Sequence, residues 1–142
     1  MTDQDRGHKK ILVVDFDGVL NSYTSGWVSA TFIPDPPVDG AMEWLWQMSR
    51  EFNLQIFSSR SKEDGGIKAM SDYIGYWAKK ILGNAEPEYR ANAVINRICN
   101  DPAAWPTQKP AAFVTLDDRA ICFTGKWPTL DELKGFKPWN KR

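Results

Sequence analysis

The chain has 142 residues, of which 42% are hydrophobic, and its 18 basic side chains balance 18 acidic ones. This length predicts one domain, expected at residues 10–142 after a disordered polar tail at residues 1–9, and the balanced charge excludes a global electrostatic attraction to nucleic acid or an anionic membrane surface. Two cysteines outside any CxxC spacing and a single histidine argue against a zinc site. No apolar run approaches the roughly 20 residues of a membrane span, and the first residues lack an apolar signal core, so we expect a cytoplasmic protein with no membrane partner.

A short apolar run followed by two aspartates marks the first predicted strand. The run from Ile11 to Val14 is typical of a strand buried on both faces of a parallel sheet. Ligand sites in such sheets lie beyond the carboxyl ends of the strands. Asp15 and Asp17 should therefore lie at the mouth of the fold, where Gly18 relieves the backbone as the chain turns away.

Beyond the first strand, the chain alternates between turn-forming and apolar segments. Residues 21–39 mix proline, glycine, aromatic and small polar side chains, which favours a loop or short flap over a helix. Asp39 is expected to cap a helix at about residues 40–52. The later elements expected are a strand at 54–57, helices at about 62–82 and 87–100, a loop at 101–110, strands at 112–116 and 121–123, and a last short helix capped by Thr129. Strands that alternate with helices predict an α/β domain with a parallel sheet.

The ends of three predicted strands carry side chains suited to phosphoryl transfer. The first strand is followed by Asp15 and Asp17, the second by residues 58–60, and the third by Asp117 and Asp118. Asp15 could attack phosphorus and form an aspartyl-phosphate, while Asp17 could protonate the leaving oxygen and later accept a proton from water. Mg²⁺ would cancel the repulsion between a carboxylate nucleophile and a phosphate dianion, with Asp117 as the natural ligand from the third strand.

Further groups are needed to bind the phosphate itself. Ser58 offers a hydroxyl and neighbouring backbone N–H groups at a helix N-terminus. Lys109 stands eight residues before Asp117 and could bind the phosphate as a point charge. Lys79 or Lys80 is the alternative source of that charge.

These motifs, taken in order, resemble those of the haloacid dehalogenase superfamily of phosphatases. The segment DFDGVL at residues 15–20 matches the first motif of that superfamily, DxDG(T/V)L. Ser58 matches the second motif, Lys109 the third, and the pair Asp117 and Asp118 the acidic fourth. The resemblance extends over most of the chain.

The resemblance implies a Rossmann-like three-layer α/β/α domain with a central parallel sheet. It also implies an aspartyl-phosphate at Asp15, acid/base catalysis by Asp17, and Mg²⁺ held by Asp15, the carbonyl of Asp17 and Asp117. Asp118 is expected to hold the metal through water or to orient the site, while Arg60 is more typical of a supporting ion pair than of a substrate contact. The whole predicted site comprises catalytic Asp15, Asp17 and Lys109, phosphate-binding Gly18, Ser58, Ser59, Arg60 and Lys109, and metal ligands Asp15, Asp17, Asp117 and Asp118.

The resulting hypothesis is a Mg²⁺-dependent phosphomonoester hydrolase, a small member with little or no cap. Residues 61–108 leave no room for a large cap domain, and an open site covered only by the flap at 21–39 favours a bulky substrate. A nucleotide, a phosphorylated nucleic-acid end or another phosphorylated molecule would fit, and no obligate protein partner is evident. The oligomeric state stays open.

Two other classes of function stay open. A signalling receiver also has an acidic pair after its first strand, but its Lys-Pro element follows the last functional carboxylate, whereas Lys109 precedes Asp117 here. A catalytically silent module that binds a phosphate or nucleotide is the other alternative. The intact set of Asp15, Asp17, Lys109 and Asp117 argues against the silent module, and the Asp-x-Asp-Gly spacing favours the hydrolase over the receiver.

Overall fold

A three-stranded parallel sheet forms the centre of the protein. The computed structural model describes residues 9–83 and 89–142. The strands Ile11–Val14 (β1), Asn53–Ile56 (β2) and Val114–Leu116 (β3) lie in the order β2-β1-β3, and β1 pairs in parallel with both neighbours. The carboxyl ends of all three strands therefore lie along one edge of the sheet. The protein has an α/β fold with a parallel sheet, as predicted.

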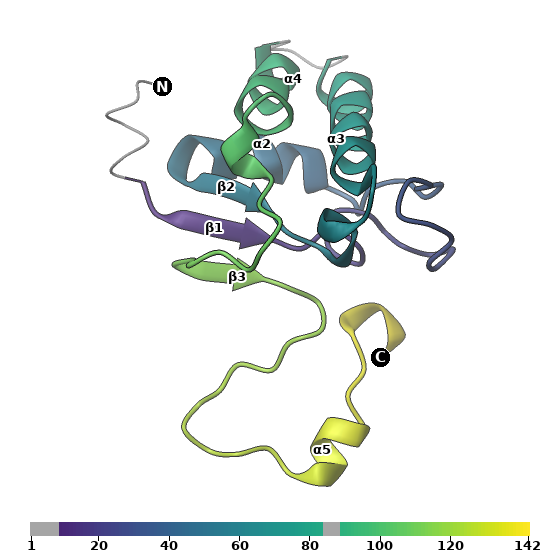
Figure 1. Ribbon diagram of the computed structural model, residues 1–142, viewed down its shortest axis with the longest axis vertical. Helices are drawn as coiled ribbons and strands as arrows, with labels where there is room; N and C mark the ends of the chain where they lie inside the picture. Colours follow the sequence, from purple (N-terminus) through teal and green to yellow (C-terminus); the bar gives the residue numbers. More distant parts are fainter. Residues whose placement is uncertain (1–8, 84–88) are drawn as a thin grey trace.

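Helices connect the strands and bury one side of the sheet. Figure 1 shows α2, α3 and α4 grouped over β1 and β2, whereas the chain beyond β3 extends away from them. The buried core joins Leu12 and Val14 of β1 with Ile56 of β2 and with apolar side chains of the helices, such as Leu45 and Ile74. The helical elements are α2 (Ala41–Glu51), η1 (Ser59–Lys62), α3 (Gly66–Leu82), α4 (Tyr89–Val94), η2 (Ile95–Cys99), η3 (Pro102–Ala104), α5 (Leu130–Lys134) and η4 (Trp139–Lys141). Within the described part of the chain, no helix is long and apolar enough to cross a membrane.

Several predicted boundaries need correction. Asp39 does not cap α2, because Gly40 occupies the N-cap position with φ +83° and no side chain caps the helix. The helix expected from residue 62 begins only at Gly66, after the 3₁₀ turn η1 and the left-handed Gly65. No strand forms at residues 121–123. These errors arise at glycines and short apolar runs, where the backbone conformation depends on tertiary neighbours.

Other sequence expectations agree with the structure. The flap at residues 21–39 contains only isolated bridges, including Asn21 with Pro37. Thr129 caps α5, since its hydroxyl accepts a hydrogen bond from the backbone N–H of Glu132. The tail expected at residues 1–9 and the helix start at Pro87 fall almost wholly outside the described residues.

The chain after β3 packs only lightly on the rest of the protein. All three residues of β3 are exposed, and α5 buries none of its side chains. The segment returns to the sheet near its end, where the indole Nε1 of Trp139 donates a hydrogen bond of 2.8 Å to the carbonyl of Gly18. The last turn of the chain is thereby attached to the loop that follows β1.

Candidate active site

Three carboxylates meet where β1 and β3 end. The backbone N–H of Asp15 donates to the carbonyl of Leu116 at 2.9 Å, which extends the pairing of the two strands by one residue. Asp15 and Asp117 are therefore neighbours, and Asp118 joins them. One carboxylate oxygen from each of these aspartates lies within 4.8 Å of the others. The structure thus brings together the first and fourth motifs, although about 100 residues separate them in sequence.

The close approach of these acids changes the protonation of Asp15. Burial is the largest cause of a rise in the pKa of Asp15 to about 8, and the charges of Asp117 and Asp118 raise it further. A hydrogen bond of 2.8 Å from the backbone N–H of Phe16 opposes this rise. The negative charge of the cluster is therefore not fully balanced by positive groups of the surrounding protein.

Gly18 is required by the position of Asp118. Its backbone has φ +82°, and a Cβ atom placed on it would lie 2.2 Å from a carboxylate oxygen of Asp118. A larger residue would push Asp118 away from Asp15, so Gly18 supports the cluster through its small size and its left-handed backbone.

The acidic cluster fits a hard divalent cation. Mg²⁺ prefers carboxylate oxygens and is commonly held by a few of them together with water and substrate oxygens. Asp15, Asp117 and Asp118 supply such oxygens. Burial first, and then the charges of Asp117 and Asp118, raise the pKa of Asp15, and a bound cation would favour its ionised form. The carboxylate of Asp17 is not part of this cluster, so only its carbonyl is left for the metal role that the sequence predicted.

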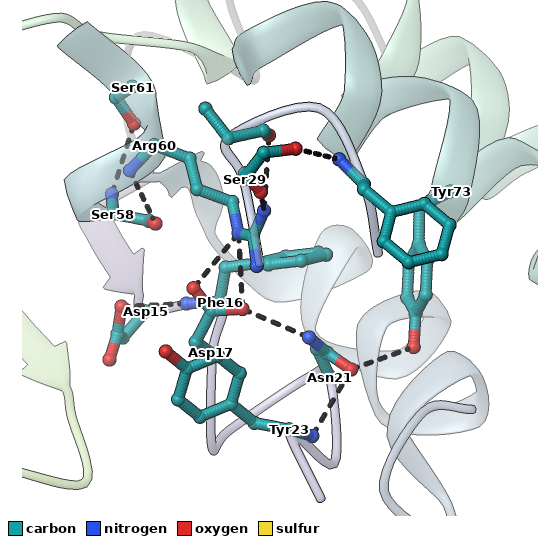
Figure 2. Close-up of polar contacts among 12 residues, drawn as sticks. Asp15, Phe16, Asp17, Asn21, Tyr23, Ser29, Ser58, Arg60, Ser61 and Tyr73 are labelled. Carbon is teal, nitrogen blue, oxygen red and sulfur yellow. Dashed lines mark hydrogen bonds and ion pairs between the residues drawn. The ribbon is translucent and has the colours of Figure 1, made fainter. Parts of the chain in front are cut away.

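Asp17 is instead held by Arg60, which is 1% exposed. The guanidinium Nε of Arg60 donates to the two carboxylate oxygens of Asp17 at 2.9 and 3.2 Å. Asn21 donates to the same carboxylate at 2.9 Å. Figure 2 shows the Arg60 side chain reaching from the start of η1 to Asp17 and the flap. The candidate acid/base is therefore fixed by a buried ion pair and an amide.

Arg60 also ties the flap to the site. Its Nη1 donates to the carbonyls of Ser29 and Ala30 at 2.7 and 3.1 Å, and its guanidinium carbon lies 4.6 Å from the ring centre of Trp27. Arg60 was predicted among the phosphate-binding residues, yet two of its nitrogens bind Asp17 and the flap. The supporting ion pair, which was the other interpretation, is the one that the structure contains.

Ser58 and Ser59 follow β2 at the same edge of the sheet. The hydroxyl oxygen of buried Ser58 accepts a hydrogen bond of 3.0 Å from the backbone N–H of Arg60, and Ser61 completes this capping box. The cap uses Ser58 as an acceptor, so its hydroxyl hydrogen is not consumed by the cap and could reach a phosphate oxygen. The Ser59 residue is exposed.

The structure does not bring the predicted lysine to the carboxylates. Lys109 is exposed in the loop between η3 and β3 and forms no hydrogen bond or ion pair within residues 9–83 and 89–142. Lys79 and Lys80 lie in the last turn of α3, about 20 Å along the helix from its first turn near β2. Lys80 packs over the rings of Tyr76 and Trp77. Neither alternative lysine is better placed than Lys109.

The sequence analysis did not identify Tyr23. The residue has φ +61°, the one positive φ among the described non-glycine residues. Burial, followed by the negative charge of Asp17, raises the pKa of its phenol, and the positive charges of Arg60 and Arg119 oppose the rise. No motif signals this position; only its place among turn-forming residues beside a catalytic motif could have drawn attention to it.

The site as a whole places a cluster of three carboxylates beside a separately held aspartate. Asp15 belongs to the cluster, and Asp17 belongs to the ion pair with Arg60. The two groups are neighbours in the segment that includes Phe16 and Gly18. Comparisons of the chain with protein-family models, with curated proteins and with solved structures found no match.

Proposed function

We propose that this protein is a Mg²⁺-dependent phosphomonoester hydrolase of the haloacid dehalogenase type, with a minimal cap. The observation that carries the proposal is the meeting of Asp15, Asp117 and Asp118 within 4.8 Å at the carboxyl edge of the parallel sheet. Asp17 lies beside this cluster and is bound to a different group. The nucleophile and the acid/base need different surroundings, and a cation bound at the cluster would favour the ionised form of Asp15 that attack on phosphorus requires.

In the proposed reaction, a carboxylate oxygen of Asp15 attacks phosphorus while the bond from phosphorus to the leaving oxygen breaks. Asp17 gives a proton to that oxygen and then takes one from the water that attacks the aspartyl-phosphate, which releases phosphate and restores Asp15. Mg²⁺, when bound by Asp15, Asp117 and Asp118, would neutralise charge on the phosphoryl group. Arg60 and Asn21 hold the Asp17 side chain in place during both proton transfers.

The substrate that we favour is bulky, such as a nucleotide or a phosphorylated nucleic-acid end. Between β2 and β3 the described chain is taken up by α3, α4, η2 and η3, which pack together and leave no separate cap. The flap at residues 21–39 is attached beside the site through Arg60. A site with so little cover supports a substrate that projects into solvent.

The test is phosphate release from a panel of nucleotides, sugar phosphates, phosphopeptides and 3′- or 5′-phosphorylated oligonucleotides, with Mg²⁺ or with chelator. Release that requires both Mg²⁺ and Asp15 supports the proposal and ranks the substrates. Formation of a stable phosphoaspartate without turnover would favour the receiver-like alternative. Phosphate or nucleotide binding with no reaction at any panel member would favour a silent binding module.

The metal assignment gives a second expected result. Asp117→Asn should raise the Mg²⁺ concentration needed for half-maximal phosphate release at least about tenfold, because an amide oxygen is a weaker ligand than a carboxylate. A Mg²⁺ titration of the activity measures this change. Asp131→Asn, in exposed α5, is the matched control and should leave the titration unchanged. An unaltered titration for Asp117→Asn would remove this residue from the metal site.

The lysine assignment gives a third expected result. Lys109→Ala should lower kcat/KM about 100-fold if the loop before β3 brings this charge to bound phosphate, since preorganised donors at a phosphoryl group have effects of this size. Lys79→Ala should have almost no effect, because its helix turn lies far from the carboxylates. Steady-state kinetics of both variants compare the two positions directly. A larger loss in Lys79→Ala would transfer the role to that residue.

A further inference from the structure

Tyr23 adopts a backbone conformation that a bulky side chain rarely takes. Its φ of +61° lies in the left-handed region, which glycine and asparagine occupy far more readily than an aromatic residue. Such conformations persist where surrounding contacts determine them, and they occur preferentially at functional sites. The outlier lies in the flap, only six residues after Asp17.

Contacts on both sides of Tyr23 hold this conformation. Its backbone N–H donates to the side-chain oxygen of buried Asn21 at 3.2 Å, and its carbonyl accepts from the backbone N–H of Gly26 at 3.1 Å. Asn21 also binds the carboxylate of Asp17 through its amide nitrogen, at 2.9 Å. The same amide therefore fixes the acid/base and the backbone of Tyr23, so the two residues have a defined relation to each other.

The side chain of Tyr23 is directed into the site. Figure 2 shows its ring extending from the flap backbone toward Asp15 and Asp17, with the hydroxyl at that end of the ring. The electrostatic neighbours of the phenol are Asp17, Asp118, Arg60 and Arg119, which surround the candidate centre. Burial, followed by the charge of Asp17, raises the pKa of the phenol, which therefore keeps its hydrogen near neutral pH and can act as a hydrogen-bond donor.

The site needs such a donor. Two nitrogens of Arg60 bind Asp17 and the flap, and Lys109 forms no contact with the carboxylates in the described chain. Phosphate held at Asp15 would therefore depend on Ser58, on backbone N–H groups and on whatever the flap supplies. The ring of Tyr23 points toward Asp15 and Asp17, so its hydroxyl is a flap group with the right chemistry and direction.

We propose that the hydroxyl of Tyr23 donates a hydrogen bond to the phosphoryl group bound at Asp15, and that the strained backbone of the flap serves to present it. This inference rests on the proposed function, because it assumes a phosphate at that position. Tyr23 then contributes to binding and orientation of the phosphoryl group and forms no covalent bond.

The experiment compares Tyr23→Phe, Tyr23→Asn and the control Tyr89→Phe with the wild-type chain. Phenylalanine removes only the hydroxyl, asparagine tolerates the left-handed backbone, and Tyr89 is an exposed tyrosine on α4. Calorimetric titration with inorganic phosphate in the presence of Mg²⁺ gives the affinity of each variant. Thermal unfolding gives its Tm, and steady-state kinetics give kcat/KM.

We expect Tyr23→Phe to weaken phosphate binding and lower kcat/KM by about three- to tenfold, the effect of one lost hydrogen bond, with an unchanged Tm. Tyr23→Asn should lose at least as much affinity while its Tm does not fall, because the strain is relieved. Tyr89→Phe should match the wild type. Wild-type affinity and kcat/KM in Tyr23→Phe would overturn the inference.

The same measurements separate this inference from the proposed function. If the wild type binds phosphate but hydrolyses no panel substrate, the proposed hydrolase fails while weaker phosphate binding by Tyr23→Phe still supports the contact. If the wild type hydrolyses phosphoesters and Tyr23→Phe is unaffected, only the inference about Tyr23 fails.

Discussion

Asp15→Asn should abolish phosphate release and, at alkaline pH, stabilise the folded protein. The loss of activity should be about 10³-fold or more, because an amide is a poor nucleophile and the reaction is proposed to pass through this side chain. The gain in stability has a separate origin. Asp15 is half-buried beside Asp117 and Asp118, and its ionisation in the folded state is unfavourable.

The direction of the pH dependence follows from the pKa of Asp15. It is about 8 in the folded protein against 3.8 as its ordinary value, so between these pH values the folded state binds a proton that the unfolded state has lost. The free energy of unfolding therefore falls as pH rises from about 4 to about 8 and stays low above that. Removing the charge should restore on the order of 3 kcal/mol at pH 9 and almost nothing at pH 3.

Urea unfolding of the wild type and Asp15→Asn at pH 3 and pH 9, in chelator, measures this difference. Asp64→Asn is the control, because Asp64 is exposed in the turn before α3. Mg²⁺ at pH 9 should stabilise the wild type more than the variant, since binding to the folded state alone raises stability. Equal pH dependence in the two proteins would show that the pKa of Asp15 is not raised in the folded state, and retained turnover would remove it as the nucleophile.

Arg60→Met should destabilise the fold by about 3–5 kcal/mol, the usual cost of removing one partner from a buried ion pair. The substitution leaves Asp17 without its cation and leaves the carbonyls of Ser29 and Ala30 without their donor. We expect the flap to become more accessible to protease in parallel. Urea unfolding and limited proteolysis measure the two effects.

A double-mutant cycle tests whether the loss comes from the charge of Asp17. Asp17→Asn combined with Arg60→Met should recover part of the stability, because no unpaired charge then remains near the core. Recovery should be incomplete, since the flap carbonyls still lack their donor. Arg50→Met, on the exposed end of α2, is the control and should change stability little. Additive effects of the two substitutions would mean that Arg60 acts through the flap and not through Asp17.

The α/β class and the position of most elements follow from local patterns. The strand at Ile11–Val14 is a short apolar run, and the strand at Asn53–Ile56 alternates polar with apolar residues. The cap at Thr129 depends on residues within one turn of helix. The helix starts were predicted less well. Gly40 and Gly65 take left-handed conformations that the sequence permits but does not require, so α2 and α3 begin later than the polar side chains suggested.

The candidate residues of the site were predictable, but their partners were not. Asp15, Asp17, Asp117 and Asp118 are recognisable from their spacing and from the strands before them, because these are relations between neighbours in sequence. The sequence also suggested Lys109, which the structure leaves in an exposed loop. Tyr23 carried no pattern, since a positive φ in a bulky residue results from contacts that form only in the folded chain.

By itself, the sequence determined which carboxylates end the strands and hence what chemistry the edge of the sheet could support. Only the tertiary structure decided that Arg60 pairs with Asp17 across 43 residues and that Trp139 reaches Gly18 across 121. The reason is physical. The free energy that an ion pair contributes and the free energy needed to ionise Asp15 both depend on burial and on nearby charges. The fold creates both conditions by bringing distant segments together.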